Sequence, residues 1–297
     1  SRLLEELHAL DFATKLANDF FPQPLHRHDL PGKNHWQAMI ERALHTFQHS
    51  QLEKVVLARK SLFTFPHQLE PLSLLMRLKN STPNLFYFYF QPEEGVAFLG
   101  GSPERLYSRE NCMLKSEAIA GTRPRGTTAH EDHALEIELL QCDKDLREHR
   151  FVVENIKENL GKLCHTVDID DEITILKLAQ VQHLRCRLQG ILADGVTDAD
   201  ILKTMHPTPA VGGSPTTQAI EAIKRLEPFD RGWYAAPLGW VSQDAAEVVV
   251  GIRSGLVDAE TLALYSGAGI VNGSTPEGEW AEIENKIANF MQAIRQA

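Results

Sequence analysis

Residue types that could do chemistry are most concentrated near the C-terminus, where a glycine-rich turn leads into a helical pattern over residues 276–297. Glu279, Glu282 and Lys286 are spaced three and four residues apart, so all three share one face of this predicted helix. Two carboxylates on one face could hold a hard cation such as Mg²⁺, which prefers oxygen ligands. A solvated charged face with a Glu–Lys ion pair fits the same spacing, and the helix alone favours that alternative.

Two glycines, Gly267 and Gly269, precede this helix at the end of a predicted strand. Because glycine lacks a β-carbon, the backbone there could approach a ligand closely. Thr275 is suited to cap the helix and Pro276 to occupy its first position. We therefore expect backbone groups of this turn to be available to a ligand.

A second acidic candidate, Glu148, lies in the long helical pattern over residues 131–164. Apolar residues follow it four and eight positions later, so its carboxylate falls on the stripe that faces the core. A carboxylate in that position is costly unless it is paired, hydrogen-bonded or bound to a metal. Arg147 and Arg150 are possible partners, but they point to other faces of the same helix.

A candidate base and a candidate acid lie at the ends of apolar, strand-like segments. Lys54 opens the segment Lys-Val-Val-Leu-Ala-Arg, and a lysine beside a core gives up its proton more readily and can act as a base. Glu104 follows a strand in Gly-Gly-Ser-Pro-Glu-Arg-Leu, a place from which an acid can project. The alternatives are an edge-strand lysine that discourages aggregation and a glutamate in a surface salt bridge.

Two segments of small residues and prolines, 118–126 and 206–215, are predicted to be turn-rich and to suit a site where backbone meets a ligand. His183 is a single histidine in a short predicted strand. Considered alone, it is better interpreted as a structural histidine with satisfied hydrogen bonds.

The elements that must position these residues come in blocks of strands and blocks of helices. Because the blocks do not alternate strictly, we expect an α+β fold in which antiparallel β-sheets pack together with helices on the outside. A single domain is expected over residues 1–297, with its catalytic core at about 36–297. Strands are predicted at 54–65, 85–91, 96–99, 173–178, 181–186, 232–242, 246–257 and 261–271, and helices at 1–20, 70–79, 131–164 (broken once) and 276–297, with a further helix around Trp36.

Composition excludes several classes of protein. With 43% hydrophobic and 24% charged residues, the chain has the composition of a globular protein. Its net charge of −10 argues against a nucleic-acid partner. Its four cysteines form no Cys-x-x-Cys pair, which fits the reducing cytoplasm and gives no zinc site. No apolar run reaches the roughly 18 residues of a membrane span, so no membrane association is expected.

Taken together, these segments resemble the chorismate-utilising enzymes, a family that includes anthranilate, aminodeoxychorismate, salicylate and isochorismate synthases. The resemblance runs from about Lys54 to Lys286, most of the chain. It is carried by L-E-K-V-V-L-A-R, G-S-P-E-R-L, A-I-A-G-T-R-P-R-G, D-K-D-L-R-E-H, V-Q-H-L, H-P-T-P-A-V-G-G-S-P, I-R-S, and G-A-G-I-V followed by E-W-A-E-I-E-N-K. It implies the anthranilate synthase component I-like fold. Members are usually longer, so we expect the N-terminal part of the family to be missing.

The resemblance also implies roles for individual residues. Glu148 and Glu282 match glutamates that bind Mg²⁺, and Glu279 matches one that supports the metal. In this family the metal binds the ring carboxylate of chorismate. Arg253 matches the arginine that binds the pyruvyl carboxylate, with Tyr234 beside it. The full set expected to contact substrate is Thr122, His183, Tyr234, Arg253, Gly267, Gly269 and Lys286.

The expected reaction follows from the nucleophile. Members that use ammonia resemble one another in carrying glutamine where this chain has Lys54, and aminodeoxychorismate synthases tend to carry lysine where it has Ala120. Water is therefore the expected nucleophile, with Lys54 as base and Glu104 as acid. This implies a Mg²⁺-dependent isochorismate synthase of the menaquinone type without a glutamine amidotransferase subunit. A salicylate synthase, an aminating enzyme and a non-catalytic chorismate-binding protein are the alternatives.

Overall fold

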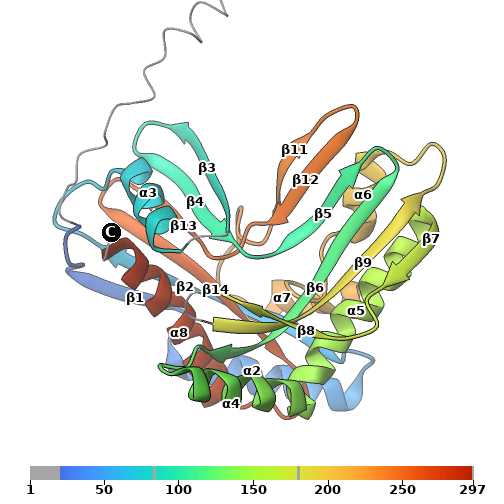
Figure 1. Cartoon of the computed structure of the whole chain (residues 1–297). Helices are drawn as coiled ribbons and strands as arrows, with labels where there is room; N and C mark the ends of the chain where they lie inside the picture. The colour runs from blue at the N-terminus through green and yellow to red at the C-terminus, as the bar shows by residue number, and fades with distance from the viewer. Residues whose placement is uncertain (1–20, 83–84, 179–180, 296–297) are drawn as a thin grey trace, which may run out of the picture.

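The computed structural model describes residues 21–82, 85–178 and 181–295, and within them it contains two antiparallel β-sheets with helices on their outer sides (Figure 1). The helix predicted over residues 1–20 lies outside the described residues. In Figure 1 the sheets form the two arms of an open V, with β3 and β4 in one arm and β5, β11 and β12 in the other. The predicted α+β class is confirmed.

The first sheet has the order β1-β2-β14-β13-β4-β3, and β10 also pairs with β2. Its long central pair is β2 and β14, whose register places Gly267 opposite Ala58 and Gly269 opposite Val56. The glycine segment is thereby fixed beside the start of β2. The strands are β1 His26–Leu30, β2 Lys54–Thr64, β3 Phe86–Glu93, β4 Val96–Ser102, β10 Gly213–Ser214, β13 Ser254–Asp258 and β14 Thr261–Ile270.

The second sheet has the order β11-β12-β5-β6-β9-β7, and β8 also pairs with β9. Its centre is the pair β6 and β9, whose ladder shifts register between Ala120 and Arg123. Gly121 takes a positive φ of 71° in this irregularity, a conformation that glycine adopts without steric cost. The strands are β5 Arg105–Glu110, β6 Met113–Pro124, β7 Cys164–Ile169, β8 Thr174–Lys177, β9 Val181–Leu192, β11 Pro237–Val241 and β12 Ala245–Val250.

The helices divide between the two sheets. Helix α8 packs on β14, α7 on β2 and α3 on β4, whereas α5 packs on β6, β7 and β9 and α4 on β6. Their bounds are α2 Lys33–His49, α3 Pro71–Ser81, α4 Ala129–Gln141, α5 Asp143–Leu163, α6 Asp198–Met205, α7 Thr216–Leu226 and α8 Pro276–Arg295. None of the helices in the described part of the chain is long and apolar enough to cross a membrane.

Alternate residues of β2 separate two hydrophobic cores. Leu57 is buried with Trp36 and Ile283 beneath the helices of the first sheet. Its neighbour Ala58 belongs to the second core, with Val152 of α5. Because successive side chains of a strand point to opposite faces, β2 connects both cores.

Three predicted strands or turns need correction, and one predicted helix break is confirmed. The predicted strand 232–242 begins only at Pro237, as β11, because Gly232 and Ala235 take positive φ values in the turns before it. Residues 118–126, predicted to be turn-rich, continue strand β6 as far as Pro124, because pairing with β9 outweighs the weak strand propensity of their Ala and Gly residues. The predicted strand 246–257 is two strands, separated by a turn in which Arg253 has a φ of 52°. The predicted break in the helix over 131–164 is confirmed, and it falls at Cys142.

Candidate active site

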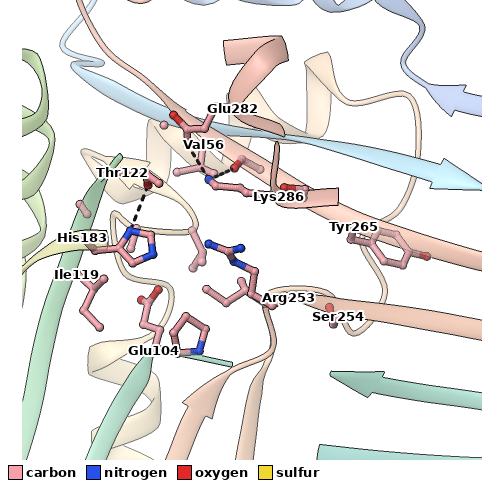
Figure 2. Close-up of a pocket in the computed structure, with 18 of the residues that line it drawn as sticks. Val56, Glu104, Ile119, Thr122, His183, Arg253, Ser254, Tyr265, Glu282 and Lys286 are labelled. Atoms are coloured by element: carbon pink, nitrogen blue, oxygen red, sulfur yellow. Dashed lines mark hydrogen bonds and ion pairs between the residues drawn. The ribbon is translucent and has the colours of Figure 1, made fainter. Parts of the chain in front are cut away.

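One cavity between the two sheets gathers most of the residues that the sequence singled out (Figure 2). The first sheet contributes the backbone of β14 and the side chain of Val56, and the second contributes residues 119–122 of β6. Predicted residues that line the cavity are Glu104, Thr122, Glu148, His183, Tyr234, Arg253, Gly267, Gly269, Glu282 and Lys286. Lys54 and Glu279 are not among the lining residues. Lys54 forms an ion pair with the lining residue Glu148, whereas Glu279 forms one with Lys144, which does not line the cavity.

Glu104 lies in the short connection between β4 and β5. Its backbone N–H donates to the hydroxyl of Ser102, and its carbonyl accepts from Val250 of β12, so the connection is held from both sides. Glu104 is 6% exposed, and it has no ion-pair partner within the described residues. The alternative that it forms a surface salt bridge is therefore wrong.

Burial raises the pKa of Glu104 to about 7, although the positive charges of Lys54 and Lys286 act in the opposite direction. In Figure 2 its carboxyl group points toward the space that the His183 ring and the Arg253 guanidinium also face. A carboxyl group with this pKa holds a proton near neutral pH and can donate it to a reacting atom.

Lys54 is the first residue of β2 and is completely buried. Its Nζ lies 3.2 Å from Oε1 of Glu148, a contact between opposite charges without hydrogen-bond geometry. Pairing of β10 with the first residues of β2 gives this end of the strand a neighbour on that side. The alternative of a solvent-facing edge lysine is therefore wrong.

Two glycines of β14, Gly267 and Gly269, leave space for the side chains of neighbouring elements that lie against the strand. A β-carbon on Gly269 would lie 2.1 Å from Oε1 of Glu148 and 3.2 Å from Cε of Lys54. A β-carbon on Gly267 would lie 3.0 Å from the hydroxyl of Tyr234. Glycine is thus required at 269 for the Glu148 carboxylate to lie against the strand.

Lys286 joins helix α8 to the same strand. Its Nζ donates to the carbonyl of Gly267 at 2.9 Å and to Oε1 of Glu282 at 2.6 Å (Figure 2). The predicted i,i+4 Glu–Lys ion pair is present, but it lines the cavity instead of forming a solvated face. Burial acts to raise the pKa of Glu282, but the ion pair with Lys286 and the charge of Lys144 act together against it, so the pKa lies below its ordinary value.

The donor set can be tested against Mg²⁺. In the described ranges no group of three or more His, Cys, Asp or Glu residues is arranged to hold a metal. Mg²⁺ is usually held by one or two carboxylates, with water and substrate oxygens completing its shell. Glu148 from α5 and Glu282 from α8 both face the cavity, so two oxygen donors fit that mode.

His183 presents one nitrogen to a partner and leaves the other free. Its Nδ1 lies 3.0 Å from the carbonyl of Gly121 and 3.1 Å from the hydroxyl of Thr122. Nε2 is buried and finds no hydrogen-bond partner in the described part of the chain. Burial and the charge of Arg253 lower the pKa of His183 to about 3, so the ring is neutral. If Nδ1 donates to Gly121, Nε2 is an acceptor.

Arg253 and Tyr234 form a further part of the cavity wall. The carbonyl of Arg253 accepts from Gly101 of β4, which anchors the turn that carries its guanidinium. Tyr234 is 6% exposed and stacks on Tyr265 with ring centroids 5.5 Å apart. Burial raises the pKa of Tyr234 to about 12, so it remains a hydrogen-bond donor at neutral pH.

Sequence reasoning missed a buried pair that supports the wall, Glu227 and Arg231. Arg231 donates to the carbonyl of Val56 at 2.8 Å, and Glu227 accepts from the backbone N–H of Ala58 at 2.7 Å. The two side chains therefore bond the part of β2 that lies between its contacts with β1 and β10. The only signal in the sequence is their spacing of four, which is common on solvated helices.

The comparisons with known proteins agree on one family. The family model described as chorismate binding enzyme matches residues 1–295. Isochorismate synthase 2, chloroplastic, of Arabidopsis thaliana is 40% identical over 271 residues, covering 90% of this chain and 48% of that protein. Isochorismate synthase MenF of Bacillus subtilis is 39% identical over 265 residues, covering 88% and 56%. The chain thus spans about half the length of these relatives.

A solved structure with the same fold is that of MenF, the menaquinone-specific isochorismate synthase from Escherichia coli. It superposes with a TM-score of 0.91 at 34% sequence identity, covering 99% of this chain and 68% of that one. Anthranilate synthase component I from Streptococcus pneumoniae superposes with a TM-score of 0.83 at 25% identity, covering 97% and 64%. The fold is therefore shared by relatives with different named activities.

Proposed function

The chain belongs to the chorismate-binding enzyme family, and on that premise we propose that it acts as a Mg²⁺-dependent isochorismate synthase. The observation that carries the proposal is a buried acid and a buried amine at one cavity: Glu104 has a pKa of about 7, and Lys54 lies near enough to act on it electrostatically. Replacement of a ring hydroxyl by water needs an acid for the departing group and a base for the attacking one. The names of the similar relatives support the same activity.

The proposed reaction is an isomerisation. Lys54 acts as the base and takes a proton from water as the water oxygen bonds to ring C2 of chorismate. The ring double bonds shift, and the C4 hydroxyl leaves as water with a proton donated by Glu104. One water enters and one leaves, so isochorismate has the composition of chorismate.

Substrate binding in this proposal uses the charge pattern of the cavity. Arg253 and the hydroxyl of Tyr234 bind the pyruvyl carboxylate. The backbone at Gly267 and Gly269, with Lys286, receives the ring carboxylate. Thr122 and His183 complete the pocket, since both side chains line the cavity.

The two cavity-facing carboxylates, Glu148 and Glu282, are proposed to hold Mg²⁺. When bound, the ion neutralises the ring carboxylate and fixes the orientation of the ring. Glu279 is proposed to support this site from the same face of α8. The oxygen donors suit a hard cation, and two of them match its ordinary mode of binding.

We also propose a pathway, partners and a cellular location for the enzyme. We infer a role in menaquinone biosynthesis from the named specificity of the Escherichia coli relative. Lys54 and Ala120 favour water over ammonia, so no glutamine amidotransferase subunit is expected. Four free cysteines fit the cytoplasm, and no nucleic acid or membrane partner is proposed.

The test is incubation of the purified protein with chorismate and MgCl₂, with and without ammonium, followed by chromatographic separation of the products. We expect isochorismate in equal yield in both samples and none after addition of EDTA. Salicylate without an added lyase would assign a salicylate synthase, and an aminated product would assign an aminating enzyme. Binding of chorismate without any product would assign a non-catalytic protein.

A further inference from the structure

The two proposed metal ligands come from helices that pack on different sheets. Helix α5, which carries Glu148, packs on β6, β7 and β9 of the second sheet. Helix α8, which carries Glu282, packs on β14 of the first sheet and on α2 and α3. The distance between the two carboxylates therefore depends on what holds one helix against the other.

Lys54 of β2 already contacts Glu148 from the first sheet, and within the described residues one ion pair joins the two helices directly. Nζ of Lys144 on α5 donates to Oε1 of Glu279 on α8 at 2.6 Å. The Glu279 side chain is 1% exposed and that of Lys144 is 33% exposed, so most of the contact is shielded from water. In the described residues, no other hydrogen bond or ion pair joins side chains of these two helices.

The pair lies one helical turn from both proposed ligands. Lys144 precedes Glu148 by four residues, and Glu279 precedes Glu282 by three, so each member shares a helix face with a ligand. A fixed contact at this level limits both the rotation of α5 about its axis and its sliding along α8. The positions of the two cavity-facing carboxylates are thereby coupled.

The contact also occupies the carboxylate of Glu279. Its oxygen accepts from Lys144, and Glu279 is not among the residues that line the cavity. Glu148 and Glu282, by contrast, do line it. Two of the three glutamates thus line the cavity, whereas Glu279 is held by Lys144 outside that lining.

We propose that Lys144 is a positioning residue, which through its ion pair with Glu279 sets the spacing of Glu148 and Glu282 for Mg²⁺. Glu279 supports the metal through this connection between the helices, with its Oε1 held by Lys144. The inference rests on the proposed function, because it needs Glu148 and Glu282 to be the ligands.

The test compares two double variants that leave the net charge of the protein unchanged. Lys144→Met/Glu279→Met removes one positive and one negative charge together with the contact. Lys144→Glu/Glu279→Lys reverses the pair and restores the contact. Mg²⁺ binding is measured by isothermal titration calorimetry without substrate, and circular dichroism checks folding.

We expect the methionine pair to weaken Mg²⁺ binding by about 10- to 100-fold, the usual cost of losing a group that orients metal ligands. The reversed pair should recover most of the affinity. The matched control is Glu158→Met/Lys162→Met, which removes an exposed ion pair within α5 and should leave binding unchanged. If the methionine pair does not fold, Lys144→Gln replaces it with the same expected loss.

The possible outcomes separate the inference from the proposed function. If the parent protein binds no Mg²⁺, both are overturned. Parental affinity in the methionine pair would overturn the inference alone. A reversed pair as weak as the methionine pair would also overturn it, since the carboxylate of Glu279 itself would then be what the ion needs.

Discussion

Glu104 illustrates how one buried group can favour catalysis and oppose stability. Its carboxyl group has a pKa of about 7 in the folded protein against an ordinary value of 4.5. The folded state therefore retains the proton that the unfolded state loses between these values, and stability falls as pH rises through this window. Above pH 7 the buried charge costs up to about 3 kcal/mol.

Glu104→Gln should reverse this balance, because the amide has the shape of the protonated acid and cannot ionise. We expect kcat to fall by about 10²- to 10⁴-fold. We also expect Tm at pH 8 to rise above that of the parent, with a smaller difference at pH 5. Differential scanning calorimetry at the two pH values, combined with a product assay, measures both effects. Equal Tm differences at the two pH values would show that Glu104 is ionised throughout.

Gly269→Ala tests the close approach of Glu148 to β14. The new β-carbon would lie 2.1 Å from the carboxylate, which must move. A displacement of about 1 Å in a catalytic site can cost about 100-fold in rate, so we expect a loss of that size with a raised Mg²⁺ requirement. The control is Gly161→Ala in α5, where a β-carbon meets nothing within 4 Å. If the Gly269→Ala enzyme were fully active, the assignment of Glu148 as a metal ligand would be wrong.

For single residues, the sequence predicted which side chains could do chemistry better than it predicted which residues those side chains would contact. The apolar stripe of α5 predicted that Glu148 must have a partner, but the partner, Lys54, is distant in sequence and becomes a neighbour only through the sheet. His183 was predicted to be satisfied, yet only its Nδ1 is, because the bulge at Gly121 gives that nitrogen a carbonyl and no described residue gives Nε2 a partner. Convergence in space is a tertiary property that spacing along the chain does not encode.

At the scale of elements, long periodic segments were predicted well and small-residue segments were not. The stripe of α8 and the break before α5 follow from helical spacing. Strand β6 was missed between residues 118 and 124, because Ala, Gly and Pro in this segment are depleted in strands and typical of turns. Pairing with β9 and the carbonyl of Ala118, which contacts His149 of α5, hold it in place.

The pair Glu227–Arg231 gives a prediction about the stability of β2. Arg231→Met would leave the Glu227 side chain, which is 2% exposed, as an unpaired buried charge. Breaking one partner of such a pair costs about 3–5 kcal/mol, so we expect a large fall in the urea midpoint. Lys162→Met, in an exposed ion pair of α5, should change stability by no more than about 0.5 kcal/mol. Similar midpoints for both variants would mean that β2 is held without Arg231.

At the scale of the whole molecule, the cavity belongs to neither sheet alone. Lys286 extends from a helix of the first sheet, and His183 and Thr122 extend from the second sheet. Arg253 lies in the turn that joins β12 of the second sheet to β13 of the first. The proposed substrate carries two carboxylates and would contact both groups at once. Binding should therefore couple the sheets, and the sequence could not indicate this because each group lies in a separate part of the chain.

The coupling can be measured with Glu104→Gln, which should bind chorismate without converting it. Ligand at about 100 times its Kd stabilises a folded protein by about 2.7 kcal/mol, so chorismate with MgCl₂ should raise Tm by several degrees. Chorismate alone should raise it less, because Glu148 and Glu282 would then repel the ring carboxylate. Adding Arg253→Ala should abolish the chorismate-dependent rise while leaving that from MgCl₂ alone, since the guanidinium contacts the substrate end away from the metal. If Arg253→Ala removed both responses, the cavity would bind its ligands as a single cluster, and the separate roles of its two ends would be wrong.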